Sequence, residues 1–136
     1  MADVARIRIS FRAMLCYVLP AGALTGAIGA YPTWVAGGAR ALWAELSAGA
    51  IVLGVMTGSA VAIVRSAARG PGKVAMAFLT ASLIRVVACL GLAGGAWAVF
   101  HLPPLTLCLW LIVFYLVVLA AEVVWLARAL RRGMAA

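Results

Sequence analysis

Apolar residues dominate the chain in four long runs, separated by short stretches that carry almost all of its charges. A helix needs about 20 apolar residues to cross the hydrocarbon layer of a membrane. The pattern therefore predicts four transmembrane helices, at residues 13–31, 46–64, 74–100 and 105–127. We expect them to form two antiparallel hairpins in a single all-α transmembrane domain over residues 1–136.

The composition points to the same class of protein. Of the 136 residues, 68% are hydrophobic and only 10% are charged, and the mean hydropathy is +1.18. Soluble domains carry roughly a quarter charged residues, so this chain has too few polar side chains to cover a water-exposed surface. It is an integral membrane protein on these grounds. The net charge of +8 does not indicate nucleic-acid binding, since the basic residues flank the apolar runs instead of forming a patch.

The distribution of the basic residues predicts the topology. One set of loops and tails carries nine of them, and the opposite set carries only Arg40, together with His101. Cytoplasmic loops are enriched in Lys and Arg, so both termini should be cytoplasmic, with the clusters close to anionic lipid headgroups. The nine are Arg6, Arg8, Arg12, Arg65, Arg69, Lys73, Arg128, Arg131 and Arg132.

The first apolar run has a second interpretation. Basic residues followed by an apolar stretch that ends in "AIGA" resemble a secretory signal with a cleavage site. The run is longer than a typical signal core, however, and it contains Pro20 and a stripe of small residues suited to helix packing. We therefore interpret it as a retained helix.

Small residues recur at four-residue spacing in three of the runs, which places them on one helix face where a neighbouring helix can approach closely. The simpler interpretation is that these faces pack against one another within the monomer. The alternative is that a face is left for a partner helix or for a second copy of the chain. The candidate packing positions are Gly22, Gly26, Ala50, Gly54, Gly58, Gly91 and Gly95.

Two charged residues, Arg85 and Glu122, fall inside the last two runs. Both are about 18 residues from the turn at Pro103 and Pro104, so in an antiparallel hairpin they lie at similar depth, towards the cytoplasmic side. One interpretation is a salt bridge that fixes the register of the hairpin. The other is that one or both side chains engage an ion, a lipid headgroup or a carboxylate of another protein.

No group of residues predicts catalysis, a cofactor or a metal site. Catalysis requires several converging polar groups, whereas Asp3 lies in a tail and His101 stands alone in a turn. Glu45 is interpreted as a residue that favours the start of the second helix through the helix dipole. The three cysteines occur singly in apolar runs and are interpreted as small buried hydrophobic residues: Cys16, Cys89 and Cys108.

The run "RSAARGPGKVAMAFLTASLIRVVACLGLAGGAWAVFHLPPL" resembles the ATP synthase I chain, also called ATP synthase protein I, of bacterial F-type ATP synthases. The shared features are a basic inner loop, the opening "KVAMAF", a basic residue at Arg85, a short outer turn and one polar residue at Glu122. The resemblance implies a bacterial inner-membrane protein that helps the c subunits to assemble into the rotor ring. It also implies that Arg85 pairs with an acidic group of a c subunit, or that the protein contributes to divalent cation supply.

A different class of function is also compatible with four apolar runs in a chain of this length. Small oligomeric transporters or channels for a divalent cation or a small solute have a similar size, as do accessory subunits of lipid-linked-sugar flippases. Transporters and channels need a polar or charged site at mid-depth along a path. The runs contain hydroxyl side chains but no carboxylate that we place at mid-membrane, so we expect the assembly role.

Overall fold

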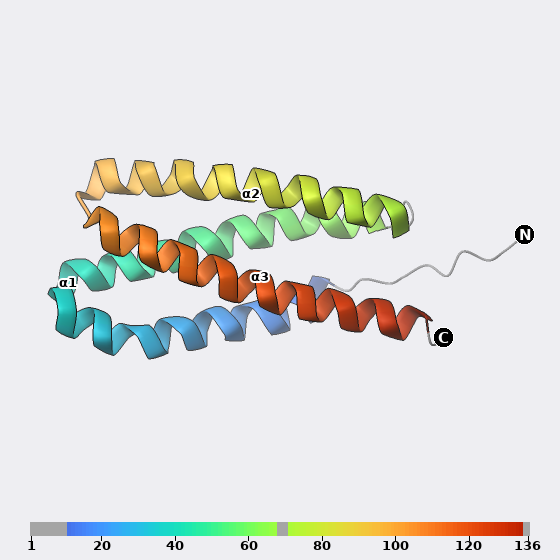
Figure 1. The fold of residues 1–136 in the computed structure, drawn as a ribbon, viewed down its shortest axis with the longest axis horizontal. Helices are drawn as coiled ribbons and strands as arrows, with labels where there is room; N and C mark the ends of the chain where they lie inside the picture. The colour runs from blue at the N-terminus through green and yellow to red at the C-terminus, as the bar shows by residue number, and fades with distance from the viewer. Residues whose placement is uncertain (1–10, 68–70, 135–136) are drawn as a thin grey trace, which may run out of the picture.

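The computed structural model describes residues 11–67 and 71–134, nearly all of which are helical (Figure 1). In chain order the helices are α1 (Phe11–Ala67), α2 (Pro71–Phe100) and α3 (Pro104–Met134). The prediction of an all-α protein is confirmed. Within these residues, three helices are long and apolar enough to cross a membrane. The protein is therefore membrane-embedded.

The prediction of four transmembrane helices in two hairpins is wrong, because residues 11–67 form the single element α1. The stretch expected to be a loop, residues 32–45, is helical except at Gly38, which has φ 64° and ψ −155°. A straight helix of 57 residues would be about 85 Å long, against a hydrocarbon layer of roughly 30 Å. Instead α1 bends back at Gly38, so that an N-terminal arm (residues 11–37) runs beside a C-terminal arm (residues 39–67) (Figure 1).

The residues around the bend explain why a loop was expected and a helix forms. The loop was expected because residues 32–45 carry Arg40 and Glu45 between two apolar runs. In the structure this stretch is part of α1, and both Pro20 and Pro32 lie inside the helix. A proline removes one backbone donor, and membrane helices tolerate this where neighbouring groups satisfy the freed carbonyl. Alanine, leucine and arginine, which are strong helix formers, follow directly after Gly38. The helical geometry therefore resumes after one residue.

A short connection at residues 101–103 joins α2 to α3. The backbone N–H of His101 donates to the carbonyl oxygen of Trp97 at 2.9 Å, and His101 itself has φ 50°. This left-handed residue closes the last turn of α2 in the manner of a C-terminal cap. Pro104 then starts α3, at a position where its missing N–H would have no helical partner in any case.

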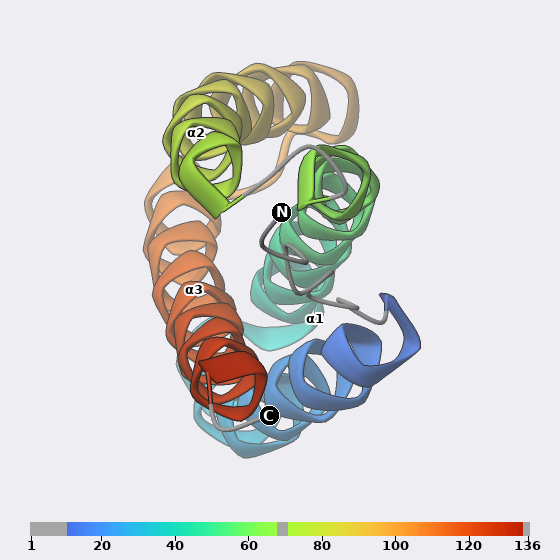
Figure 2. The same ribbon diagram turned by 90° about the vertical axis from the view of Figure 1, so that its right-hand side faces the viewer.

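The three helices do not contact one another equally. Both α2 and α3 pack mainly on α1, and α2 contacts α3 far less (Figure 2). The buried face of α3 repeats at spacings of three and four residues, which is the spacing of one helix face. This face supplies much of the apolar core, through Leu107, Leu111, Phe114, Val118 and Trp125. The face of α2 that meets the rest of the protein is a narrow stripe, and most of its other side chains are exposed.

Replacing Gly38 with alanine is expected to lower the free energy of unfolding by about 1–2 kcal/mol, because a Cβ disfavours positive φ. Gly38 combines positive φ with ψ near −155°, a region that residues with a Cβ rarely adopt. The measurement is an SDS titration of the purified protein in detergent, followed by far-UV circular dichroism. Gly54→Ala is the matched control, since Gly54 is helical with open space around its Cβ position. Equal stability of the two variants would contradict a strained bend at Gly38.

Candidate functional site

Arg85 lies near the middle of α2 and faces into the protein. Its neighbours on the same helix face, Ala81, Cys89 and Ala93, follow at four-residue intervals and are also buried. The small side chains of this stripe let α2 approach the other helices closely, while the long arginine side chain reaches between them. Arg85 is 0% exposed, and it is the largest fully buried side chain among those described. A guanidinium group in such a place needs partners for its charge and its donors.

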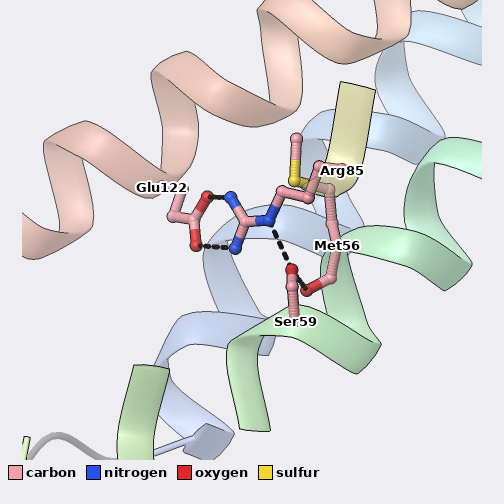
Figure 3. Close-up of polar contacts among 4 residues, drawn as sticks. All are labelled: Met56, Ser59, Arg85 and Glu122. Carbon is pink, nitrogen blue, oxygen red and sulfur yellow. Dashed lines mark hydrogen bonds and ion pairs between the residues drawn. The ribbon is translucent and has the colours of Figure 1, made fainter. Parts of the chain in front are cut away.

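Glu122 of α3 supplies the first partner (Figure 3). Arg85 Nη1 donates to Glu122 Oε2 at 2.5 Å, and Arg85 Nη2 donates to Glu122 Oε1 at 2.8 Å. This is the two-pronged geometry in which an arginine and a carboxylate interact most strongly. Glu122 is only 2% exposed. The structure thus joins the two residues whose equal distance from the turn suggested a pair.

Ser59 in the C-terminal arm of α1 supplies the second partner. Arg85 Nε donates to the Ser59 hydroxyl oxygen, and this hydroxyl in turn donates to the backbone carbonyl of Met56 at 3.0 Å (Figure 3). Serine can accept one bond and donate another, so it satisfies the arginine without leaving its own proton unpaired. The guanidinium therefore ties together all three helices. The aromatic ring of Phe78 also lies near the guanidinium, with its centroid 6.0 Å from Arg85 Cζ.

The arrangement is electrically neutral and closed. Both terminal nitrogens of Arg85 are directed at Glu122, and its Nε is directed at Ser59. The pair is buried on both sides, which strengthens the attraction between the charges and excludes competing water. In this conformation the site holds the helices in register. It presents no free charge to an ion or a substrate.

The predicted packing glycines of the N-terminal arm do lie at helix contacts. A Cβ added to Gly22 would come within 2.9 Å of Leu53, and one added to Gly26 would come within 3.6 Å of Phe114. The sequence analysis missed Gly49, whose added Cβ would lie 3.0 Å from Phe114. Phe114 of α3 therefore reaches both arms of α1 at a glycine.

The other predicted packing positions face outwards. A Cβ added at any of four glycines would have no atom within 4 Å, and Ala50 is exposed. Among the described residues, the four glycine positions therefore have no neighbouring helix packed against them. Their small side chains leave an uneven, closely approachable surface on the C-terminal arm of α1 and on α2. The four glycines are Gly54, Gly58, Gly91 and Gly95.

Glu45 is the residue whose place the sequence analysis did not anticipate. It does not start a helix, because α1 is already helical from Ala39 onwards, and its side chain is only 1% exposed. Thr33 and Gly29 of the N-terminal arm and Trp110 of α3 lie around it. The only signal in the sequence was that acidic residues are rare in this apolar chain. An acidic side chain is costly to place in a membrane, so each one that occurs there is a candidate for a specific role.

The remaining candidates are dispersed. Cys89 is buried, while Cys16 and Cys108 are exposed, and His101 is exposed in the connection. In the described part of the chain, no three His, Cys, Asp or Glu side chains come close enough together to hold a metal ion. Asp3 lies outside the described residues.

Comparison of the chain with protein-family models, with curated proteins and with solved structures gives no match.

Proposed function

We propose that the protein is a non-enzymatic accessory protein of a bacterial F-type ATP synthase, which assists assembly of the c-ring in the cytoplasmic membrane. The resemblance of residues 65–105 to the ATP synthase I chain motivates the partner. The structural observation that carries the proposal is the set of outward-facing glycines on α1 and α2, which have open space at their Cβ positions.

Those glycines suit a transient contact with another apolar helix. Lipid tails are as apolar as the side chains, so moving a side chain from lipid to a helix contact gains little free energy. Helices in a membrane therefore associate through close packing, where small residues let their backbones approach. Gly91 and Gly95 provide such a face on α2, which is otherwise lined by large exposed side chains such as Leu83, Val87 and Leu90. A c subunit is itself a small glycine-rich hairpin, according to the resemblance. Its helix would fit against this face before the ring closes.

The charge pair plays a supporting part in this proposal. Glu122 and Ser59 already occupy the donors of Arg85 that are directed into the protein. An acidic group of a c subunit would have to displace Glu122 from a fully buried position to pair with Arg85. We therefore assign the contact with the c subunit to the glycine face, and the pair to keeping α2 in place beneath that face.

The ends of the helices support a placement with both termini in the cytoplasm. The start and end of α1, the start of α2 and the end of α3 lie at one end of the bundle, and the Gly38 bend and residues 101–103 lie at the other (Figure 1). Arg40 is at the bend end. Arg6, Arg8 and Arg69 lie outside the described residues. Six basic residues of the described segments belong to the first end, which favours its cytoplasmic placement: Arg12, Arg65, Lys73, Arg128, Arg131 and Arg132.

The test is to replace Gly91 and Gly95 together with leucine in cells that lack the wild-type gene. We expect the yield of assembled c-ring, measured on native gels, to fall as it does in the deletion strain. We also expect capture of the c subunit by the purified variant to weaken about tenfold, a loss of about 1.4 kcal/mol. The variant should fold normally, because both Cβ positions face open space in the monomer.

The matched control is Ala120→Leu, which adds bulk to an exposed position of α3. It should leave both the yield and the capture unchanged. An unaltered c-ring yield in the deletion strain would refute the assembly role. A fall in yield after deletion that the double leucine variant fully rescues would refute the glycine face as the contact.

A further inference from the structure

Glu45 is a buried acidic side chain without a partner in the described part of the chain. It is 1% exposed, and neither Oε1 nor Oε2 has a hydrogen-bond partner among residues 11–67 and 71–134. The Thr33 hydroxyl lies next to the carboxyl group without the geometry of a hydrogen bond. By contrast, Glu122, buried to nearly the same extent, accepts two hydrogen bonds from Arg85. The two carboxyl groups of the membrane region thus have opposite environments within one chain.

No charged group faces Glu45 from the elements packed around it. Among the described residues the only ion pair is Arg85–Glu122, so no cationic nitrogen lies within 4 Å of either Glu45 oxygen. The charged and titratable residues that these elements carry near the bend end are all exposed. They are Tyr31 of the N-terminal arm, Arg40 of the C-terminal arm, His101 of the connection and Cys108 of α3.

The surroundings fit a carboxylic acid better than a carboxylate or a metal complex. A buried carboxylate needs donors or a cation to offset its desolvation, and the hydroxyl placed beside Glu45, that of Thr33, does not donate to it. A protonated carboxyl group carries no charge and needs only an acceptor for its proton. Hard cations require about six or more oxygen ligands, which one carboxyl group and one hydroxyl do not supply.

A groove near the bend end of the protein is lined by side chains that border this group. Its volume is about 290 Å³, and its lining includes Thr33, Ala41 and Trp110. Thr33 and Trp110 also lie beside Glu45, and Ala41 precedes Glu45 by one helical turn. The groove therefore brings a small reagent, or a proton carried by water, as far as the Thr33 and Trp110 side chains that border the carboxyl group.

We propose that Glu45 is a proton-binding site, with a carboxyl group that holds its proton at neutral pH and exchanges it through this groove. Its ligand is a proton, and Thr33 is the hydroxyl-bearing side chain that lies beside the carboxyl group. The site is separate from the Arg85–Glu122 pair and does not depend on the assembly role.

The test uses a hydrophobic carbodiimide, N,N′-dicyclohexylcarbodiimide, which reacts with protonated carboxyl groups in apolar surroundings. The full-length protein in lipid vesicles is treated from about pH 6 to about pH 9, and labelled peptides are quantified by mass spectrometry. We expect at least about tenfold more label on Glu45 than on Glu122 near pH 7. We also expect the label on Glu45 to fall as the pH rises. Glu122 serves as the internal control because its oxygens are held by Arg85.

A second measurement separates a charged Glu45 from one that the reagent cannot reach. Infrared spectra of the wild-type protein and of Glu45→Gln are compared near neutral pH. The carbonyl stretch of a protonated carboxylic acid should be present in the wild type and lost in the variant. Preferential label on Glu45 over Glu122, or loss of this band in the variant, supports the proposal. Absence of both results overturns it.

Discussion

Glu122→Leu is expected to lower the free energy of unfolding by about 3–5 kcal/mol, the largest loss for any single substitution considered. The variant leaves the Arg85 guanidinium 0% exposed and without its carboxylate. Arginine does not give up its proton at any ordinary pH, so the charge stays in the apolar interior. The measurement is SDS-induced unfolding of the purified protein, followed by far-UV circular dichroism.

The reverse deletion, Arg85→Met, should lower the free energy of unfolding by less, about 1–3 kcal/mol. It leaves a carboxyl group that can take up a proton and become neutral, and a Ser59 hydroxyl that still donates to the Met56 carbonyl. This difference between the two single variants distinguishes a buried ion pair from ordinary packing, where the loss would follow the volume removed.

The double variant Arg85→Met, Glu122→Leu completes the cycle. We expect it to recover most of the lost stability, since replacing a buried ion pair by apolar side chains of similar volume is often neutral or stabilising. An additive loss would contradict a stabilising salt bridge between Arg85 and Glu122. The c-ring yield of the double variant then tests whether the pair acts only on the fold or is also recognised by a partner. If the stable double variant restores c-ring yield, the pair acts only on the fold. If it does not, a partner recognises one of the charges.

The Arg85–Glu122 pair could be predicted from the sequence for a geometric reason. Two helices joined by a short turn place residues at equal distances from the turn at equal depth, and the α2–α3 connection is only residues 101–103. The contact of Ser59 with Arg85 could not be predicted in this way, because it depends on the bend of α1 at Gly38. One residue of shift at the bend would turn a different side chain towards the guanidinium.

The glycine faces show a second limit of the sequence. In a soluble protein the inward face of a helix is the apolar one, but in a membrane the outward face is apolar as well. Spacing alone therefore identifies a small-residue face without telling whether it points inwards. Gly22 and Gly26 face the core, while Gly54 and Gly58, with the same spacing, face open space. The reversal of the chain between residues 31 and 46 was expected as a loop, because this stretch separates two apolar runs and carries Arg40 and Glu45, whereas the structure makes it at the single non-helical residue Gly38.

Gly29→Ala is expected to lower the free energy of unfolding by about 3 kcal/mol, at the upper end for an overpacked core. An added Cβ would overlap the ring of Trp110 and come within 2.6 Å of Glu45 Oε1. The ring has little freedom to move aside, because it packs against Phe114 at a centroid distance of 5.9 Å. Gly26→Ala, less than one helical turn away, is the matched control, since its Cβ would make an ordinary contact at 3.6 Å. It should leave the free energy of unfolding unchanged or raise it by up to about 1 kcal/mol.

The steric clash with Trp110 can be separated from the intrinsic effect of replacing a glycine in a helix. This is done by measuring Gly29→Ala in a variant that lacks the Trp110 ring. If the Trp110 ring is what opposes the new methyl group, Gly29→Ala should be much less destabilising in a Trp110→Leu background than in the wild type. The coupling between the two positions should then be at least about 1 kcal/mol, measured by the same SDS titrations. Equal effects of Gly29→Ala in both backgrounds would show that Trp110 does not pack on Gly29. In that case α3 would have to contact the N-terminal arm differently at this end of the bundle.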